Sequence, residues 1–131
     1  MIWGCQWDAT LRWMQTSSDE KVKNFPTNSV AYGNYLDNTV TYKESENGED
    51  KLAVSRKLIP TGGSEQTKIN NIYDLAGNAW EWTMQAGGRE TRIAIGGTCY
   101  YDGNSASTKT AENSRANNFD YGSRLTLYIT P

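Results

Sequence analysis

A Gly77-Asn78 turn between two short extended segments is the feature of the sequence that most constrains the fold. Residues 68–73 and 79–84, on either side of this turn, have the lengths and residue types of short strands. We also expect strands at 91–95 and at 125–129, where apolar residues alternate with Thr126 and Tyr128 as in a half-buried terminal strand. The second half of the chain is therefore predicted to consist of short strands joined by turns.

The first half of the chain has one segment with helical periodicity. Four apolar residues follow one another at spacings of four, four and three: Trp3, Trp7, Leu11 and Met14. This spacing places them on one face of a short amphipathic helix at residues 3–14. Because the helix begins almost at residue 1, we expect either a trimmed chain or the remaining part of a longer domain, with an N-terminal portion missing.

Residues 16–50 show no sustained period, so we expect mostly irregular loop there. An aromatic cluster lies at residues 32–35, and acidic residues concentrate at residues 44–50 between Lys43 and Lys51. A solvated loop or hairpin explains this acidic stretch better than a metal site does.

Length and charge limit the classes of partner. The 131 residues fit one domain, which we expect to span residues 1–131. The formal net charge is −2, so the chain has no general attraction to nucleic acid or to anionic lipid. The apolar runs are too short for a membrane span or for the core of a signal peptide. We therefore expect neither nucleic-acid binding nor membrane insertion, while a homo-oligomer stays open.

The aromatic composition points to recognition. Five tryptophans and eight tyrosines accompany only two phenylalanines, with 12 glycines and many short polar residues. Small, loop-rich recognition domains use this mixture, because Tyr and Trp supply contact area at low entropic cost. A core rich in tryptophan is the alternative, and we expect it to hold for most of the five tryptophans.

Histidine is absent, which removes the usual general base and a common transition-metal ligand. The two cysteines, Cys5 and Cys99, are too far apart in sequence for a local metal or redox motif. Whether they pair or stay free is open at this point, and so is the redox compartment.

Three segments of the second half resemble the formylglycine-generating enzyme (sulfatase-modifying factor) family. Residues 71–83, Asn-Ile-Tyr-Asp-Leu-Ala-Gly-Asn-Ala-Trp-Glu-Trp-Thr, are similar to its signature. Gly96-Gly97-Thr98 resembles its Gly-Gly-Ser turn. Residues 122–125 resemble its closing Gly-Phe-Arg strand, with Ser123 in place of the aromatic residue. The resemblance implies an α+β domain of the C-type-lectin-like fold, with a short helix, a small antiparallel sheet and much irregular loop.

The resemblance also implies a calcium site in the signature loop. The matching ligands are the side chains of Asp74 and Glu81 and the backbone carbonyls of Gly77 and Ala79, with water completing the shell of oxygen ligands. The alternative is a plain turn, in which Asp74 accepts backbone hydrogen bonds and Trp80 and Trp82 lie on buried and half-buried faces.

The catalytic residues of the family are missing. Its copper enzymes are similar in placing two cysteines shortly after the Gly-Gly-Ser turn, where paired thiolates hold Cu(I). This chain has Cys99 directly after Thr98, then Tyr101 and Ala106, and no later cysteine. The related sulfoxide synthases use histidines on iron. We therefore expect no copper and no enzymatic activity of either kind.

Three basic residues near the same region are candidate anion contacts. The simpler interpretation is that Arg124 anchors the terminal strand through backbone or carboxylate hydrogen bonds, while Lys109 and Arg115 are solvated.

The last third of the chain combines aromatic rings with short amides and hydroxyls, a mixture typical of antibody-like binding surfaces. We expect nine residues to contact a ligand: Tyr100, Tyr101, Asp102, Asn104, Asn113, Arg115, Asn117, Phe119 and Tyr121. The resemblance extends to non-enzymatic members of the fold, among them phage receptor-binding proteins and bacterial display proteins diversified by retroelements.

The sequence thus predicts a non-catalytic module that binds a protein or a glycan, on a phage tail or a bacterial surface. Three alternatives stay open. One is an enzyme of altered or lost chemistry, which would need a concave pocket with converging polar groups. Another is a structural fragment of a larger domain, which would expose apolar area around Trp3 and Trp7. The last is an ordinary Asn-rich loop without a partner.

Overall fold

The computed structural model describes residues 1–116 and 118–125, and these form a small α+β structure. Two α-helices, α1 (Gly4–Gln15) and α2 (Glu20–Asn24), precede all of the described strands. The strands are β1 (Val40–Tyr42), β2 (Lys51–Ala53), β3 (Lys68–Ile69), β4 (Ile72–Tyr73), β5 (Trp80–Ala86), β6 (Thr91–Ile95), β7 (Lys109–Asn113) and β8 (Tyr121–Ser123). Short 3₁₀ turns lie at Val30–Tyr32 and Glu65–Thr67. In the described part of the chain, no helix has the length and apolar character needed to cross a membrane.

The predicted N-terminal helix is confirmed as α1. Its buried side, Trp7, Leu11 and Met14, packs with Phe25, Ile69 and Ile95 in the main core. Trp3 does not join this side, because it stands at the helix N-terminus, where its backbone N–H donates to Gln6 Oε1 at 2.8 Å. Its side chain is 47% exposed.

The expectation that most tryptophans are buried is wrong. Only Trp7 and Trp80 are buried, Trp82 is half-buried, and Trp3 and Trp13 are exposed. Trp13 lies outside the buried stripe of α1, so its ring faces solvent. Trp80 and Trp82 do have the buried and half-buried positions expected of them.

Residues 16–50 are mostly irregular, as predicted, but they also contain α2, a 3₁₀ turn and β1. Helix α2 is too short to show a period, but Asp19 caps it by accepting a hydrogen bond from Lys21 N at 2.9 Å. The acidic stretch is the exposed connection of the β1–β2 hairpin, as expected, and Lys51 pairs with Glu44 there.

Residues 68–73 form a hairpin rather than one strand. Asn70 and Asn71 both have positive φ, 49° and 64°, and they connect β3 to β4. Two-residue hairpins favour asparagine at these positions, because its side chain tolerates the left-handed region.

The largest sheet has the strand order β7-β6-β5-β8. Strands β5, β6 and β7 pair in antiparallel fashion, but β8 lies parallel to β5, with Tyr121 opposite Trp80. The prediction of an antiparallel sheet is therefore wrong at this edge. The sequence signal also missed β7, because its residues are mostly polar or small. Strand β8 overlaps residues 122–125, where the resemblance implied a closing strand. The strand predicted at 125–129 lies outside the described residues except for Leu125, which is exposed and in no strand.

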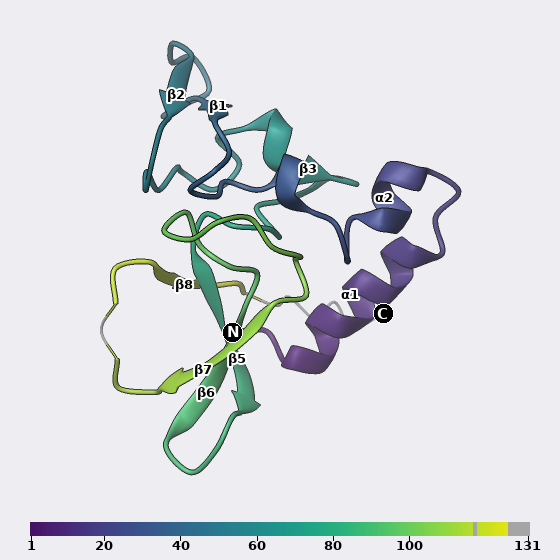
Figure 1. Cartoon of the computed structure of the whole chain (residues 1–131), viewed down its shortest axis with the longest axis vertical. Helices are drawn as coiled ribbons and strands as arrows, with labels where there is room; N and C mark the ends of the chain where they lie inside the picture. Colours follow the sequence, from purple (N-terminus) through teal and green to yellow (C-terminus); the bar gives the residue numbers. More distant parts are fainter. Residues whose placement is uncertain (117, 126–131) are drawn as a thin grey trace, which may run out of the picture.

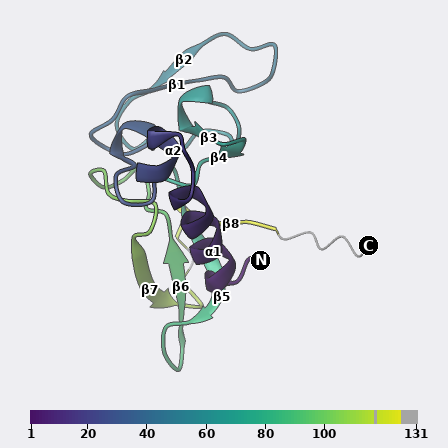
Figure 2. The same ribbon diagram turned by 90° about the vertical axis from the view of Figure 1, so that its right-hand side faces the viewer.

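The two faces of this sheet have different surroundings. We call the side toward α1 the helix face; it carries Glu81, Ile95 and Lys109. Figure 2 shows α1 alongside β5 and β6, and Lys109 Nζ reaches Asp8 of α1 at 2.9 Å. Since side chains alternate along a strand, the neighbouring positions point the other way. We call that side the outer face, and it carries Trp80, Trp82, Arg92, Ala94, Thr110 and Glu112.

The sheet and the β1–β2 hairpin lie toward opposite ends of the molecule (Figure 1). Between them runs the irregular segment 96–108, which Trp7 and Tyr35 hold in place. Trp7 Nε1 donates to the Ala106 carbonyl at 3.0 Å, and Tyr35 Oη donates to the Asn104 carbonyl at 2.9 Å. The core therefore positions the loop that leads into the outer face.

Candidate functional site

A pocket of about 490 Å³ opens on the outer face of the sheet. We call it the aromatic pocket. Its walls are Trp80, Tyr100, Tyr101, Thr110, Glu112, Asn118, Phe119, Asp120 and Tyr121.

Regular structure positions the base of the aromatic pocket. Trp80 and Tyr121 are register partners on β5 and β8, with ring centroids 6.4 Å apart. Thr110 and Glu112 are two residues apart on β7, so both side chains point to the outer face. Ala94 is paired across the strands with Trp82 on one side and Thr110 on the other, and it is buried. Its small side chain leaves the middle of this face without a large group.

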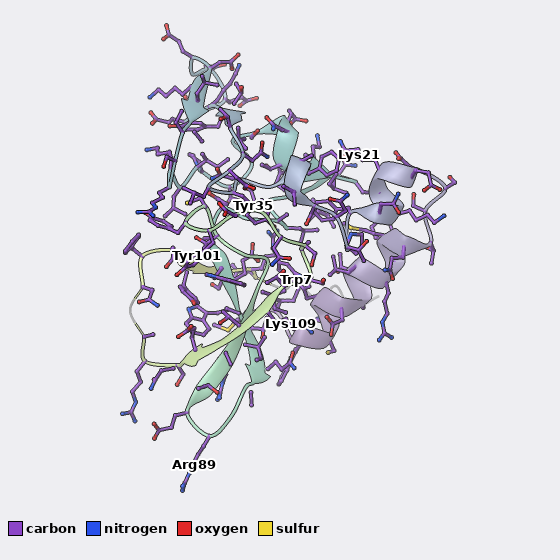
Figure 3. All side chains as sticks on the ribbon, viewed as in Figure 1. Trp7, Lys21, Tyr35, Arg89, Tyr101 and Lys109 are labelled. Atoms are coloured by element: carbon purple, nitrogen blue, oxygen red, sulfur yellow. The ribbon has the colours of Figure 1, made fainter. Side chains whose placement is uncertain are left out.

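The tyrosines at the rim come from the loop after β6. Gly96 and Gly97 have φ values of 99° and 86°, which reverse the chain there. The Tyr101 carbonyl then accepts a hydrogen bond from Leu36 N at 3.0 Å, and Gly103 N donates to Asp37 Oδ1 at 2.8 Å. These bonds fix the loop, and Tyr101 lies on the opposite side of the view from α1 (Figure 3).

Two of the rings at the rim, Tyr101 and Phe119, are exposed, and Tyr100 is half-buried. Tyr100 and Phe119 meet edge to face with centroids 5.1 Å apart. Phe119 is 74% exposed and Tyr101 is 66% exposed. Large rings held at the mouth of a pocket offer contact area that costs little side-chain entropy on binding.

The aromatic pocket has a negative electrostatic character. Burial, the carboxylates of Glu112 and Asp120, and a hydrogen bond to Glu112 raise the pKa of Tyr121 to about 12. No lysine or arginine is among the described lining residues. The nearest basic residue in register is Arg92, opposite Glu112 on β6, but its Nη1 donates to the Thr91 carbonyl at 3.1 Å.

Four of the nine predicted ligand residues line this pocket: Tyr100, Tyr101, Phe119 and Tyr121. Asn104 instead has a structural contact, because its carbonyl accepts hydrogen bonds from Tyr35 and Ser29.

Three other predicted ligand residues, Asp102, Asn113 and Arg115, are exposed but do not line the aromatic pocket. Asn113 accepts a hydrogen bond from the Arg115 backbone at 2.9 Å, which closes a local turn. Asn117 lies outside the described residues.

The prediction missed five lining residues: Trp80, Thr110, Glu112, Asn118 and Asp120. The alternation of Thr110 and Glu112 was the available signal for two of them, since it fits one side of an exposed strand. Trp80 was expected to be buried, and it is, with one edge of the ring at the pocket base.

The Gly77-Asn78 turn organises the centre of the fold. The Asn78 side chain is buried and exchanges two hydrogen bonds with the Ile59 backbone, at 2.9 and 3.0 Å. It also accepts one from Asn34 Nδ2 at 3.0 Å. A Cβ on Gly77 would lie 2.4 Å from the Asn34 carbonyl oxygen, so glycine is required there.

Both oxygens of the Asp74 carboxylate accept hydrogen bonds from groups of the protein. Its Oδ1 accepts from the Thr67 hydroxyl at 2.7 Å and its Oδ2 accepts from Gly62 N at 3.0 Å. Asp74 is buried, so these two bonds satisfy a charge that water does not reach.

Glu81 pairs with a side-chain cation. Arg124 Nε donates to Oε2 at 2.6 Å and Nη2 donates to Oε1 at 2.5 Å. The same Nη2 reaches the carbonyls of Tyr73 and Asp74 at 2.9 and 3.0 Å, and the guanidinium lies 5.7 Å from the Trp7 ring centroid. Burial raises the pKa of Glu81, and Arg124 opposes that rise.

The predicted calcium ligands do not fit the ion as they are arranged. A calcium ion would have to displace the guanidinium of Arg124 from Glu81 and the two donors from Asp74. Arg124 instead anchors the end of β8 to both carboxylate and carbonyl groups, as predicted for it. Lys109 is exposed, as predicted, and it also pairs with Asp8.

A second hollow on the outer face adjoins the N-terminus. It has a volume of about 490 Å³ and is lined by Met1, Trp3, Trp82, Thr83, Met84, Arg92 and Ser114. The Trp82 and Tyr121 rings, 4.8 Å apart, link it to the aromatic pocket. Trp7 is buried, so apolar exposure near the N-terminus comes from Trp3 and Met1.

The cysteines are both free: Cys5 is exposed and Cys99 is buried. Burial raises the pKa of the Cys99 thiol to about 11, which keeps it protonated at neutral pH. In the described part of the chain, no three His, Cys, Asp or Glu side chains gather closely enough to hold a metal ion.

Comparison of the chain with models of known protein families, with curated proteins and with solved structures found no match.

Proposed function

We propose that this protein is a non-catalytic ligand-binding module and that the aromatic pocket is its binding site. The observation that carries the proposal is the convergence of Tyr100, Tyr101, Phe119 and Tyr121, which come from two loops and β8, on one hollow beside Trp80. Exposed rings around a concave surface are the usual anchors of protein recognition.

The resemblance of residues 71–83 to the formylglycine-generating enzyme signature supports a C-type-lectin-like scaffold for this module. Within that proposal the ligand is a macromolecule, and the setting is a phage tail or a bacterial surface. The signature turn serves the scaffold through Asn78 and the Glu81–Arg124 pair.

An enzyme of altered chemistry is the weaker proposal. The cysteine nearest to the pocket, Cys99, is buried with a raised pKa, so it is a poor nucleophile at neutral pH. The titratable groups that line the pocket are carboxylates and phenols.

Arrays of immobilised peptides and glycans, probed with the labelled protein, test the proposed function. We expect a restricted set of spots, lost in a Tyr101→Ala/Phe119→Ala double variant. Both side chains are exposed, so the variant keeps its fold, which circular dichroism verifies. Leu52→Ala is the matched control, because Leu52 is 62% exposed on the β1–β2 hairpin. Spots that persist in the double variant would contradict the proposal.

A further inference from the structure

We infer that the aromatic pocket binds the guanidinium group of an arginine side chain presented by a partner protein. This inference rests on the proposed function and names the chemical group that the pocket selects.

Two kinds of side chain in the pocket attract the same group. The aromatic rings of Trp80, Tyr100 and Phe119 line the pocket, and a cation is stabilised next to such π-systems. Glu112 and Asp120 add two carboxylates to the same wall. An anionic ligand group would be repelled by these carboxylates, and a neutral one would leave them without a counter-charge.

The carboxylate of Glu112 lies beside two groups of the pocket base. The Thr110 hydroxyl lies 3.5 Å from its Oε1, and its negative charge helps to raise the pKa of the Tyr121 phenol. Both neighbours come from the base of the pocket. Glu112 is half-buried, so its charge is less screened than that of a fully exposed carboxylate.

The basic residues of the sheet do not neutralise the pocket. Lys109 points to the helix face and pairs with Asp8, while Arg92 lines the second hollow and donates to the Thr91 carbonyl. Among the described residues, therefore, the two pocket carboxylates have no lysine or arginine within ion-pair distance.

The shape of the site favours guanidinium over ammonium. A guanidinium is planar, stacks on aromatic rings and donates two parallel hydrogen bonds to a carboxylate, whereas an ammonium is a compact and strongly hydrated charge. The carboxylates beside stacked rings therefore match arginine better than lysine. Arginine is also among the residues that dominate binding energy at protein interfaces.

The test uses the full chain, labelled with ¹⁵N, and follows the indole N–H resonances of Trp80 and Trp82 by NMR. The probes are N-acetyl-arginine amide, N-acetyl-lysine amide and N-acetyl-citrulline amide, the last being a neutral group of the same shape as arginine. We expect arginine to bind about tenfold more tightly than citrulline, from the cation–π and ion-pair contributions together.

Glu112→Gln should abolish the preference for arginine over citrulline, and Glu49→Gln, an exposed change in the β1–β2 connection, should leave it intact. Equal binding of arginine and citrulline, or binding of neither, would overturn the inference. Equal binding of lysine would overturn the choice of guanidinium.

The array experiment separates this inference from the proposed function. Spots that depend on Phe119 but carry glycans or arginine-free peptides would overturn the inference and leave the binding function in place. If every spot persists in the Tyr101→Ala/Phe119→Ala variant, the function itself is overturned. Spots rich in arginine that disappear in Glu112→Gln would support both.

Discussion

The two faces of the four-stranded sheet handle charge and aromatic surface in opposite ways. On the helix face, Glu81 meets Arg124, Lys109 meets Asp8, and the Trp7 ring is buried. On the outer face, Glu112 and Asp120 have no cationic partner among the described residues, and Tyr101 and Phe119 are exposed.

A binding site is easier to form on a sheet face whose polar groups are not yet paired. A face whose polar groups are already satisfied gains little from a ligand. A face with exposed rings and with carboxylates that lack a cation can make those interactions with a partner instead. Mutations on the helix face should therefore lower the free energy of unfolding, whereas mutations on the outer face should weaken ligand binding.

The largest effect is expected from Arg124→Ala. This change leaves the Glu81 carboxylate, with a side chain 12% exposed, without its cation and removes the donors to two carbonyls. Breaking such a pair costs about 3–5 kcal/mol of unfolding free energy. Urea denaturation measures it, with the exposed Arg115→Ala as control. A loss below about 1 kcal/mol would show that the helix face does not depend on this pair.

Lys109→Ala should have a smaller effect on the same face. The Lys109–Asp8 pair is partly exposed, at 35% and 41%, and water screens it. We expect a loss of at most about 1 kcal/mol, which added salt reduces. A larger, salt-independent loss would mean that α1 depends on this contact for its docking.

Phe119→Ala should leave stability within about 0.5 kcal/mol, because the ring is largely exposed. Its contact with Tyr100 is the one packing interaction that the change removes among the ring contacts described. The melting temperature of Phe119→Ala, measured in parallel with its binding to the array, checks that the change weakens binding without lowering stability. Destabilisation comparable to Arg124→Ala would erase the distinction between the faces.

The titration of two tyrosines sharpens the comparison. Tyr35 in the core and Tyr121 on the outer face both have a pKa of about 12, against 10.0 for the free group. Because folding raises these values, their stabilising contribution is complete below pH 10 and is lost as the pH rises toward 12. Glu112→Gln should lower the pKa of Tyr121 and leave that of Tyr35 unchanged, as measured by NMR of the ring carbons. An unchanged pKa of Tyr121 would mean that burial and Asp120 raise it without Glu112.

The smallest effect is expected from calcium. Since Arg124 and protein donors occupy the oxygens of Glu81 and Asp74, excess calcium should not raise the melting temperature above that measured with chelator. A ligand that binds the folded state alone raises stability by RT ln(1 + [L]/Kd). A clear rise, lost in Asp74→Ala, would show that the loop rearranges around the ion.

Prediction from sequence succeeded where local chemistry is sufficient. The helical spacing of Trp7, Leu11 and Met14 predicts a helix whose apolar side faces the core. It failed for β7, where polar residues are compatible with either loop or strand. Four of the pocket residues were identified by residue type, but Glu112 and Asp120 were not, because an isolated carboxylate in sequence is most often a solvated one.

By itself the sequence determined the helix at the N-terminus, the strand at 91–95 and the turn at Gly77-Asn78, because spacing and backbone preference act over a few residues. Tertiary structure alone decided that β8 lies parallel to β5 and that Arg124 reaches Glu81. Each of these pairs is separated by many residues along the chain. Only the packing of the whole sheet brings such residues together, since no local preference records which distant partner a side chain will meet.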